Sequence, residues 1–310
     1  MTGPGRLFAG LAAVVCLAAG VSASGPRPAA AQASTQPAGG ADGGGGDVVA
    51  RGTVVFRAAG CMSCHTDSKN LGRPLAGGRP LITPFGTFYT PNITPDRDTG
   101  IGNWSVADLS RSLHEGLSPA GSHYYPAFPY TSYTGMTDQD VGDLWAFLMA
   151  QPPVIQANRP HELSLPFRFR ASLGVWKGLF FSAGRFAPDP GRDAAWNRGA
   201  YLVQVMGHCG ECHTPRGALG GLDGDKRLAG TAKGPDGKKV PNITPHPQDG
   251  IGKWTESDIS YFLKTGIFPD GDAAGGAMVE VIEDGTSFLD DSDRSAIARY
   301  LLDLPPIAGP

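Results

Sequence analysis

Residues 61–65 read CMSCH and residues 209–213 read CGECH, so the pattern Cys-x-x-Cys-His occurs twice in this chain. The chain has 310 residues and five cysteines, and only Cys16 lies outside the two copies. Two plain disulfides would account for the paired cysteines but not for the histidine that follows each pair. The repeated histidine therefore indicates that each copy forms one site of three side chains.

Zinc binding and thioredoxin-like chemistry fit the spacing poorly. Paired zinc motifs lie about 15–20 residues apart, whereas these copies are 148 residues apart. A thioredoxin-like motif accompanies a β-α-β unit, and no such unit is visible. C-x-x-C-H is instead the signature of a covalently attached c-type haem. Two thiols one helical turn apart can bond the two vinyl groups of a porphyrin, while the histidine binds its iron and a backbone carbonyl holds the other ring nitrogen.

We therefore expect two covalently bound haem c groups. The predicted attachment and proximal residues are Cys61, Cys64 and His65 for the first haem and Cys209, Cys212 and His213 for the second. Met278 lies in a Gly-rich stretch, predicted as a loop, about 12 residues before the last predicted helix. Its thioether would complete the coordination of the second iron.

The sequence around the motifs is duplicated as well. The string PNITP begins at residues 91 and 241, and a GIG-x-W string ends at Trp104 and at Trp254. Both are followed by a helical pattern with Ser or Thr at its start, Asp three residues later and Gly at its end. Another helical pattern closes each half before a Pro-Pro pair. Because strand signals are sparse, we predict an all-α fold of two tandem domains with long loops.

The two predicted domains span residues 48–153 and 195–306 and are joined by a linker, residues 154–194. Residues 168–186 of this linker are aromatic and apolar with scattered cations. This composition predicts an amphipathic helix packed between the domains. A docking face for a membrane surface or a larger subunit is the alternative interpretation.

The N-terminus has the features of a secretory signal peptide, predicted for residues 1–33. Arg6 precedes an apolar run over residues 7–21, and small residues follow. This run is shorter than the roughly 20 residues that a membrane span prefers, so an uncleaved anchor is the lesser alternative. Residues 34–47 consist mainly of Gly, Ala, Pro and Gln, which predicts a disordered tether. We expect an exported protein that is soluble or is attached to a membrane through a partner.

Three blocks carry a resemblance to a known family: PFGTFYTPNITPDRDTGIGNW (84–104), YYPAFPYTSYTGMTDQD (124–140) and AYLVQVMGHCGECHTP (200–215). They resemble the multi-haem cytochrome c subunits of bacterial membrane-bound dehydrogenases of the alcohol, aldehyde and gluconate type. The resemblance covers about residues 48–306. It implies tandem cytochrome c domains and a periplasmic protein that passes electrons from a dehydrogenase large subunit to a quinone, a cytochrome or an oxidase. The best-known members have three haem units, whereas this chain has two motifs.

One position departs from the family pattern. Many members read YPAMPY, with the methionine as the implied axial ligand of the first haem, but this chain has Phe128 there. Met136 is the nearest thioether and the tentative ligand, although it matches Leu289 of the second half, which favours a core role. His123 is a second candidate. The third possibility is that no protein group completes the first iron.

Two functions follow from these features. An electron-transfer subunit fits a repeated haem domain without a substrate-binding domain. The alternative is a di-haem redox enzyme of the peroxidase or thiosulfate-oxidising type, with an open haem in the first domain. Nucleic acid is not an expected partner, because the formal net charge is −3 and no Lys/Arg cluster is present.

Overall fold

The computed structural model describes residues 45–234 and 237–310. The predicted signal peptide and residues 34–44 of the predicted tether lie outside this part of the chain. Residues 45–47, which we expected in the tether, form the first turn of helix α1 (Gly45–Ala58). Asp47 in this turn pairs with Arg51 at 3.1 Å, an i,i+4 contact that supports the helix start.

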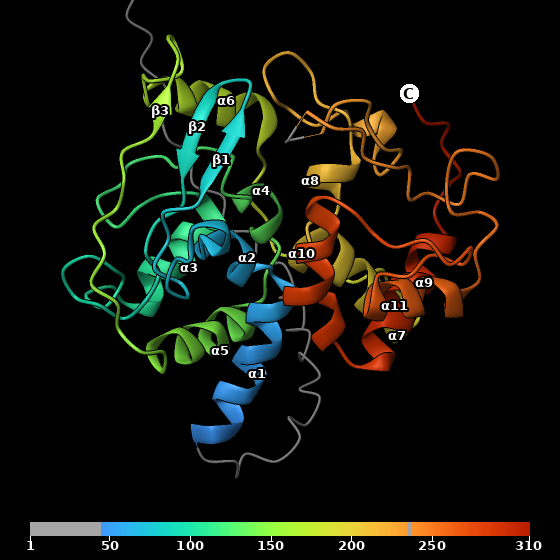
Figure 1. The fold of residues 1–310 in the computed structure, drawn as a ribbon, viewed down its shortest axis with the longest axis horizontal. Coiled ribbons are helices and arrows are strands. Elements are labelled where there is room, and N and C mark those ends of the chain that lie inside the picture. Colours follow the sequence, from blue (N-terminus) through green and yellow to red (C-terminus); the bar gives the residue numbers. More distant parts are fainter. Residues whose placement is uncertain (1–44, 235–236) are drawn as a thin grey trace, which may run out of the picture. The chain divides into compact units, whose positions relative to one another are not determined.

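The described chain is rich in helix (Figure 1). The elements of its first part are α1, α2 (Cys61–His65), η1 (Ser68–Asn70), β1 (Pro80–Thr83), β2 (Gly86–Tyr89), α3 (Val106–Glu115), α4 (Tyr130–Tyr133), α5 (Asp138–Met149), β3 (Glu162–Leu163) and α6 (Ser172–Phe180). The later elements are α7 (Ala194–Tyr201), η2 (Leu202–Met206), α8 (Gly210–His213), η3 (Gly224–Lys226), α9 (Glu256–Thr265), α10 (Ala277–Asp284), η4 (Thr286–Phe288) and α11 (Asp291–Leu302).

The long helices of the two halves cross in the same way. Helix α1 packs against α5, and α7 packs against α11 (Figure 1). A Cβ atom on Gly52 would lie 2.0 Å from the carbonyl oxygen of Asp143, and one on Gly199 would lie 1.9 Å from that of Ala296. No side chain fits in so short a distance, so both crossings require glycine. The main hydrophobic core contains residues of both halves, which belong to one compact unit.

The helices predicted after Trp104 and Trp254 are present with the expected caps. Ser105 and Asp108 form a reciprocal capping box at the start of α3, and Thr255 and Asp258 form one at the start of α9. Gly116 ends α3 with a φ of 60°, a left-handed conformation that glycine adopts without steric cost. The caps explain why these helices begin and end where the sequence pattern predicts.

A small antiparallel sheet corrects the all-α prediction. Its strand order is β1-β2-β3, with Thr83 paired with Gly86 in the tight β1–β2 turn. The third strand comes from the predicted linker, and Tyr89 Oη donates to Glu162 Oε1 at 3.0 Å. Strands of two to four residues are too short to show a period in the sequence, and β3 is separated from β2 by more than 70 residues.

The segment that carries Met278 also differs from the prediction. Met278 is the second residue of helix α10 rather than part of a loop. Gly276, with a φ of 63°, turns the chain just before this helix. The residues that follow, AMVEVIED, include Ala, Met and Glu, which are strong helix formers, and this preference outweighs the flanking glycines.

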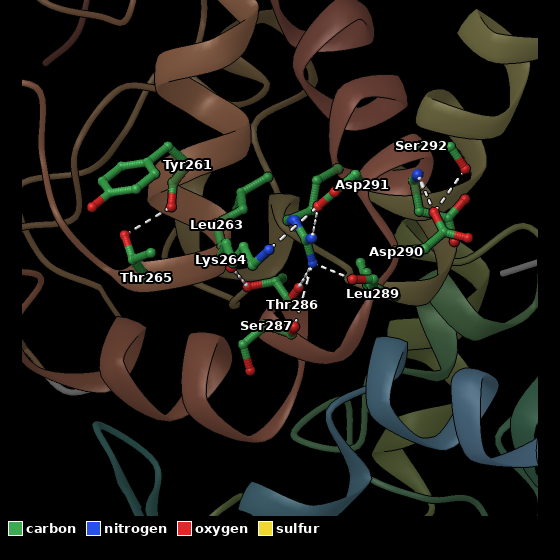
Figure 2. A network of polar contacts seen from close by, with 12 residues as sticks. Tyr261, Leu263, Lys264, Thr265, Thr286, Ser287, Leu289, Asp290, Asp291 and Ser292 are labelled. Carbon is green, nitrogen blue, oxygen red and sulfur yellow. Dashed lines mark hydrogen bonds and ion pairs between the residues drawn. The ribbon is translucent and has the colours of Figure 1, made fainter.

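A buried arginine fixes the chain between α10 and α11. The Arg294 side chain is only 3% exposed and contacts Asp291, which also lies 3.6 Å from Lys264 Nζ of α9. The guanidinium also donates to three backbone carbonyls, those of Thr286, Ser287 and Leu289 (Figure 2). Because these carbonyls precede α11, Arg294 joins α11 to the chain that follows α10, and Lys264 joins Asp291 to α9.

Two asparagines at matched positions each bind the chain that follows the last helix of their half. Asn92 is 1% exposed, and its Nδ2 donates to the carbonyl of Val154 at 2.7 Å. Asn242 Nδ2 donates to the carbonyl of Ile307 at 2.7 Å in the same way. Each Oδ1 accepts from the backbone N–H two residues later, that of Thr94 or Thr244. Both the nitrogen and the oxygen of each side-chain amide are therefore hydrogen-bonded. Val154 and Ile307 lie just beyond the domain ends predicted at 153 and 306.

The predicted linker packs largely on the first half. Its helix, α6, is shorter than the stretch 168–186. Lys177 Nζ donates to the carbonyls of Glu115 and Gly116 at the end of α3, at 2.5 and 2.9 Å. Val175 and Leu179 of α6 remain 69% and 65% exposed. Within residues 45–234 and 237–310, no helix is long and apolar enough to cross a membrane.

We predict that Asn92→Ala lowers the free energy of unfolding by about 2–3 kcal/mol, because the Val154 carbonyl and the Thr94 amide lose their buried partner. Chemical denaturation of the haem-loaded protein measures this loss. Asn103→Ala removes an exposed asparagine of the same loop and is the matched control, with an expected change below about 0.5 kcal/mol. Equal effects of the two substitutions would contradict the role given to Asn92.

Candidate haem sites

The two cysteines of the first motif lie on one short helix. Gly60, with a φ of 63°, turns the chain into α2, which begins at Cys61 and ends at His65. Burial, and to a lesser degree the neighbouring Cys64, raises the pKa of the Cys61 thiol to about 12. Burial likewise raises the pKa of Cys209 to about 12 in the second motif. Thiols that resist ionisation are unsuited to nucleophilic catalysis, which favours a structural role for them.

The histidines of the two motifs have the same hydrogen bond. The His65 ring lies with Nδ1 2.8 Å from the carbonyl oxygen of Pro91, and His213 Nδ1 is 2.8 Å from that of Pro241. A carbonyl can only accept, so Nδ1 carries the proton and Nε2 presents its lone pair. Burial lowers the pKa of both rings, which keeps them neutral. This is the tautomer that a metal-binding imidazole needs.

These side chains fit a haem c. Each motif places two thiols one helical turn apart, followed by a neutral imidazole whose Nε2 is available and whose orientation is fixed by a proline carbonyl. In each half this proline directly precedes the buried asparagine, Asn92 or Asn242. The loop that orients each histidine is therefore held from its other side by the Asn92 or Asn242 amide.

Met278 lies in a partly buried position on α10, packed against the main core. Helix α10 contacts both α9 and α2, so it lies between its own half and the first motif. Two residues along, Glu280 forms an ion pair with Arg79 at 2.6 Å, and Arg79 also donates to the carbonyl of Ser63 within the first motif. The methionine helix of the second half is thus joined to the first motif by a charged pair.

The two candidate ligands of the first iron, Met136 and His123, and Phe128 at the place of the family methionine lie in different surroundings. Met136 is fully buried in the main core, directly before the N-cap of α5, and the matching Leu289 is buried as well. Phe128 packs against aromatic rings, including that of Tyr133 at 5.8 Å between centroids. His123 is only partly buried, and its Nδ1 has no hydrogen-bond partner among the described residues.

Side chains of the second motif also contact the first half. Glu211, between Cys209 and Cys212 of the second motif, is 8% exposed. Its Oε1 accepts from Thr131 Oγ1 at 2.7 Å and from Ser132 Oγ at 3.1 Å, and Arg216 neutralises its charge. The first motif has Ser63 at the matching place, so this contact exists only once. It fixes the second motif against α4.

Comparison with known proteins identifies the fold and its cofactors. The family described as "Cytochrome c" matches residues 49–152. A "Diheme cytochrome c-type" protein of Cereibacter sphaeroides is 48% identical over 266 residues, which cover 83% of this chain and 86% of that protein. The chain belongs to the cytochrome c family. This confirms the resemblance found in the sequence and the two covalently bound haem c groups of this cytochrome.

Other relatives are subunits of larger assemblies by name. The "Fructose dehydrogenase cytochrome subunit" of Gluconobacter japonicus is 41% identical over 83% of this chain. The "Gluconate 2-dehydrogenase cytochrome c subunit" of Pantoea cypripedii is 40% identical over 83% of this chain. The chain spans 52% and 59% of the length of these two relatives.

The cytochrome contains polar residues that the sequence reading did not single out. Glu211, Arg79 and Glu280 join the two halves, and His208 lies beside the second motif. The sequence offered one signal for them, a difference between the two motifs: the residues between the cysteines are Met-Ser in the first and Gly-Glu in the second. A charged residue between the cysteines of only one copy indicates a role that the repeat itself does not require.

Proposed function

We propose that this cytochrome is the electron-transfer subunit of a dehydrogenase complex, receiving electrons from the large subunit and passing them to a quinone, a cytochrome or an oxidase. The observation that carries the proposal is the pair of matched imidazoles, His65 and His213, each held by a proline carbonyl beside two thiols in one compact unit. The names of the fructose and gluconate dehydrogenase relatives support it. Haem supplies a one-electron couple, and the chain holds it and sets its surroundings.

In this proposal the first haem is attached to Cys61 and Cys64, with His65 as the proximal ligand. The second is attached to Cys209 and Cys212, with His213 as the proximal ligand and Met278 as the distal one. Each haem belongs to one of two tandem cytochrome c domains, residues 48–153 and 195–306, joined by the segment 154–194. The matched caps, helix crossings and asparagine contacts of the two halves support this division.

Met136 is the proposed distal ligand of the first haem. Its complete burial keeps water away from the sulfur, and it lies in the same core as α2. His123 is the second candidate. If neither binds, the first haem is open, and Phe128 in place of the usual methionine is the observation that favours this alternative. An open haem would support the di-haem enzyme of the peroxidase or thiosulfate-oxidising type.

We propose a periplasmic location, with the signal peptide removed and the protein soluble or held at the membrane by its partner. The exposed apolar side chains of α6, Val175 and Leu179, lie within the stretch 168–186, where the sequence predicted either an interdomain helix or a docking face. Trp176 Nε1 donates to the carbonyl of Leu219 at 2.8 Å, so α6 also contacts the second half. This supports packing of the helix between the two halves, with one face left for a membrane or a large subunit.

We predict that the Cys61→Ala/Cys64→Ala double variant retains one covalent haem per chain instead of two, because only the first attachment site is lost. Intact-protein mass and a pyridine haemochrome assay measure the number. Ser63→Ala, which changes a residue between the same two cysteines and leaves both thiols in place, is the matched control and keeps two haems. Retention of two covalent haems in the double variant would refute the assignment of the first site.

We predict that both ferric haems are low-spin and unaffected by added cyanide, because each iron has two protein ligands. Met278→Leu and Met136→Leu each create one high-spin haem that binds cyanide, as seen by EPR and absorption spectra. Met206→Leu, which changes another buried methionine, leaves both haems unchanged. A high-spin haem in the unmodified protein that persists unaltered in Met136→Leu would exclude Met136 and favour the enzyme alternative.

We predict that the tagged protein, purified from its native host, carries with it a larger subunit with dehydrogenase activity toward an alcohol, aldehyde, sugar or sugar acid. Adding that substrate to the purified complex reduces both haems. The isolated cytochrome, washed free of the large subunit by salt, is the control and stays oxidised. Absence of such a subunit, together with rapid turnover of hydrogen peroxide by the isolated cytochrome, would contradict the proposal.

A further inference from the structure

Helix α10, which carries Met278, contacts α9 of the second half and α2 of the first (Figure 1). Met278 and Ile282 are four residues apart, so their side chains leave the helix on the same face. Ile282 is 3% exposed, and its Cδ1 lies 3.6 Å from where a Cβ on Gly266 would stand, at the end of α9. Glu280 follows Met278 by two residues, or about 200° around the helix, and leaves the opposite face. The methionine therefore faces the second half and the glutamate faces the first.

Two arginines of the first half hold the glutamate side of α10. Arg79 Nη2 lies 2.6 Å from Glu280 Oε2. One helical turn later, Arg57 Nη1 donates to the carbonyl of Asp284 at 3.2 Å. The Arg57 guanidinium also lies over the Phe288 ring, 3.9 Å from its centroid. The first half thus binds the helix at two places, one of them close in sequence to Met278.

The chain that enters α10 gives Met278 little support. The N-cap residue is Gly276, which has no side chain to bond the first turn of the helix. Among the described residues, no atom outside the immediate chain neighbours lies within 4 Å of a Cβ placed on Gly275 or on Gly276. Met278 is the second residue of the helix and lies at this end. Its position therefore depends on contacts that α10 makes further along, and Glu280 makes a charged one two residues later.

Arg79 is itself fixed beside the first motif. Its backbone N–H donates to Thr90 Oγ1 at 3.2 Å, and Thr90 directly precedes the proline whose carbonyl orients His65. Its Nη1 donates to the carbonyl of Ser63, between the two cysteines of the first motif. The side chains of Arg79 and Glu280 are 17% and 26% exposed, so the ion pair is partly shielded from water. One guanidinium therefore joins the first motif to the helix that carries Met278.

We propose that Arg79 is a positioning residue for the second haem: through Glu280 it holds α10, so that the first half keeps Met278 on the second iron. This inference rests on the proposed function, in which Met278 is the distal ligand of that haem. Residues that do not touch a metal can still decide how firmly its ligands bind, because they orient the ligand side chains. Without the ion pair the methionine still binds, but α10 moves away more often and a competing ligand displaces the sulfur more easily.

The test measures how readily imidazole displaces the methionine in the ferric, haem-loaded protein, followed by loss of the absorption band of the methionine–iron bond. We expect Arg79→Ala and Glu280→Ala each to lower the imidazole concentration at half displacement about fivefold, the upper end of what a partly exposed ion pair contributes. The double variant should lower it no further than either single variant, because the two residues act through one contact.

Arg198→Ala is the matched structural control. It breaks the ion pair between Arg198 of α7 and Asp293 of α11, 2.7 Å apart, which belongs to the same half as Met278. We expect it to lower the free energy of unfolding without changing the imidazole concentration at half displacement. A change in this control equal to that in Glu280→Ala would show a general loss of stability and would overturn the positioning role.

Met278→Leu assigns the band to the second haem and separates this inference from the proposed function. If Met278→Leu loses that band while the Arg79 and Glu280 variants behave as the unmodified protein, the positioning role is wrong and the ligand assignment stands. If the two single effects add in the double variant, the residues act independently and the inference is also wrong. If Met278→Leu keeps the whole band, Met278 is not a ligand and that part of the proposed function fails. If Arg79→Ala loses a covalent haem, Arg79→Gln, which keeps a donor for the Ser63 carbonyl, replaces it in the same comparison.

Discussion

The hydrogen bond from each motif histidine to a proline carbonyl is the interaction on which the rest of the structure depends. It fixes the tautomer of His65, but a carbonyl can do this only if its loop is itself immobile. Asn92, the next residue after Pro91, holds the loop in place because its side-chain amide donates to the carbonyl of Val154, just after the last helix of its half. The dipeptide Pro91-Asn92 thus orients the histidine, fixes the loop and binds the end of its half. Pro241 and Asn242 do the same in the second half.

The repeat made much of each half predictable from sequence. The two motifs, the capped helices after Trp104 and Trp254 and the closing helices all appear where their patterns indicated. These features depend on residues close together in the chain, so local chemistry determines them. The short sheet and helix α10 were not predicted, because β3 is two residues long and pairs with a distant strand, and because helix-forming residues outweighed the glycines before Met278.

The packing of one half on the other could not be predicted, for a different physical reason. A duplicated sequence describes what the two copies share, whereas the contact between them depends on what they do not share. Glu211 and His208 occupy places where the first half has Ser63 and Gly60. The buried hydrogen bond from Thr131 to Glu211 and the contact of the His208 ring with that of Tyr133 join the halves in one direction only, so the surroundings of the two motifs differ although the motifs match.

The position of the segment after α5 has a consequence for dissecting this protein. Val154 receives the Asn92 amide, β3 pairs with β2, Lys177 closes the end of α3, and the Phe181 ring lies 5.1 Å from that of Tyr130. All of these contacts belong to the first half. A fragment made for expression or for limited proteolysis would therefore need to extend past Phe181 to retain them, and a cut at residue 153 would leave the Asn92 amide, strand β2 and the end of α3 without these partners.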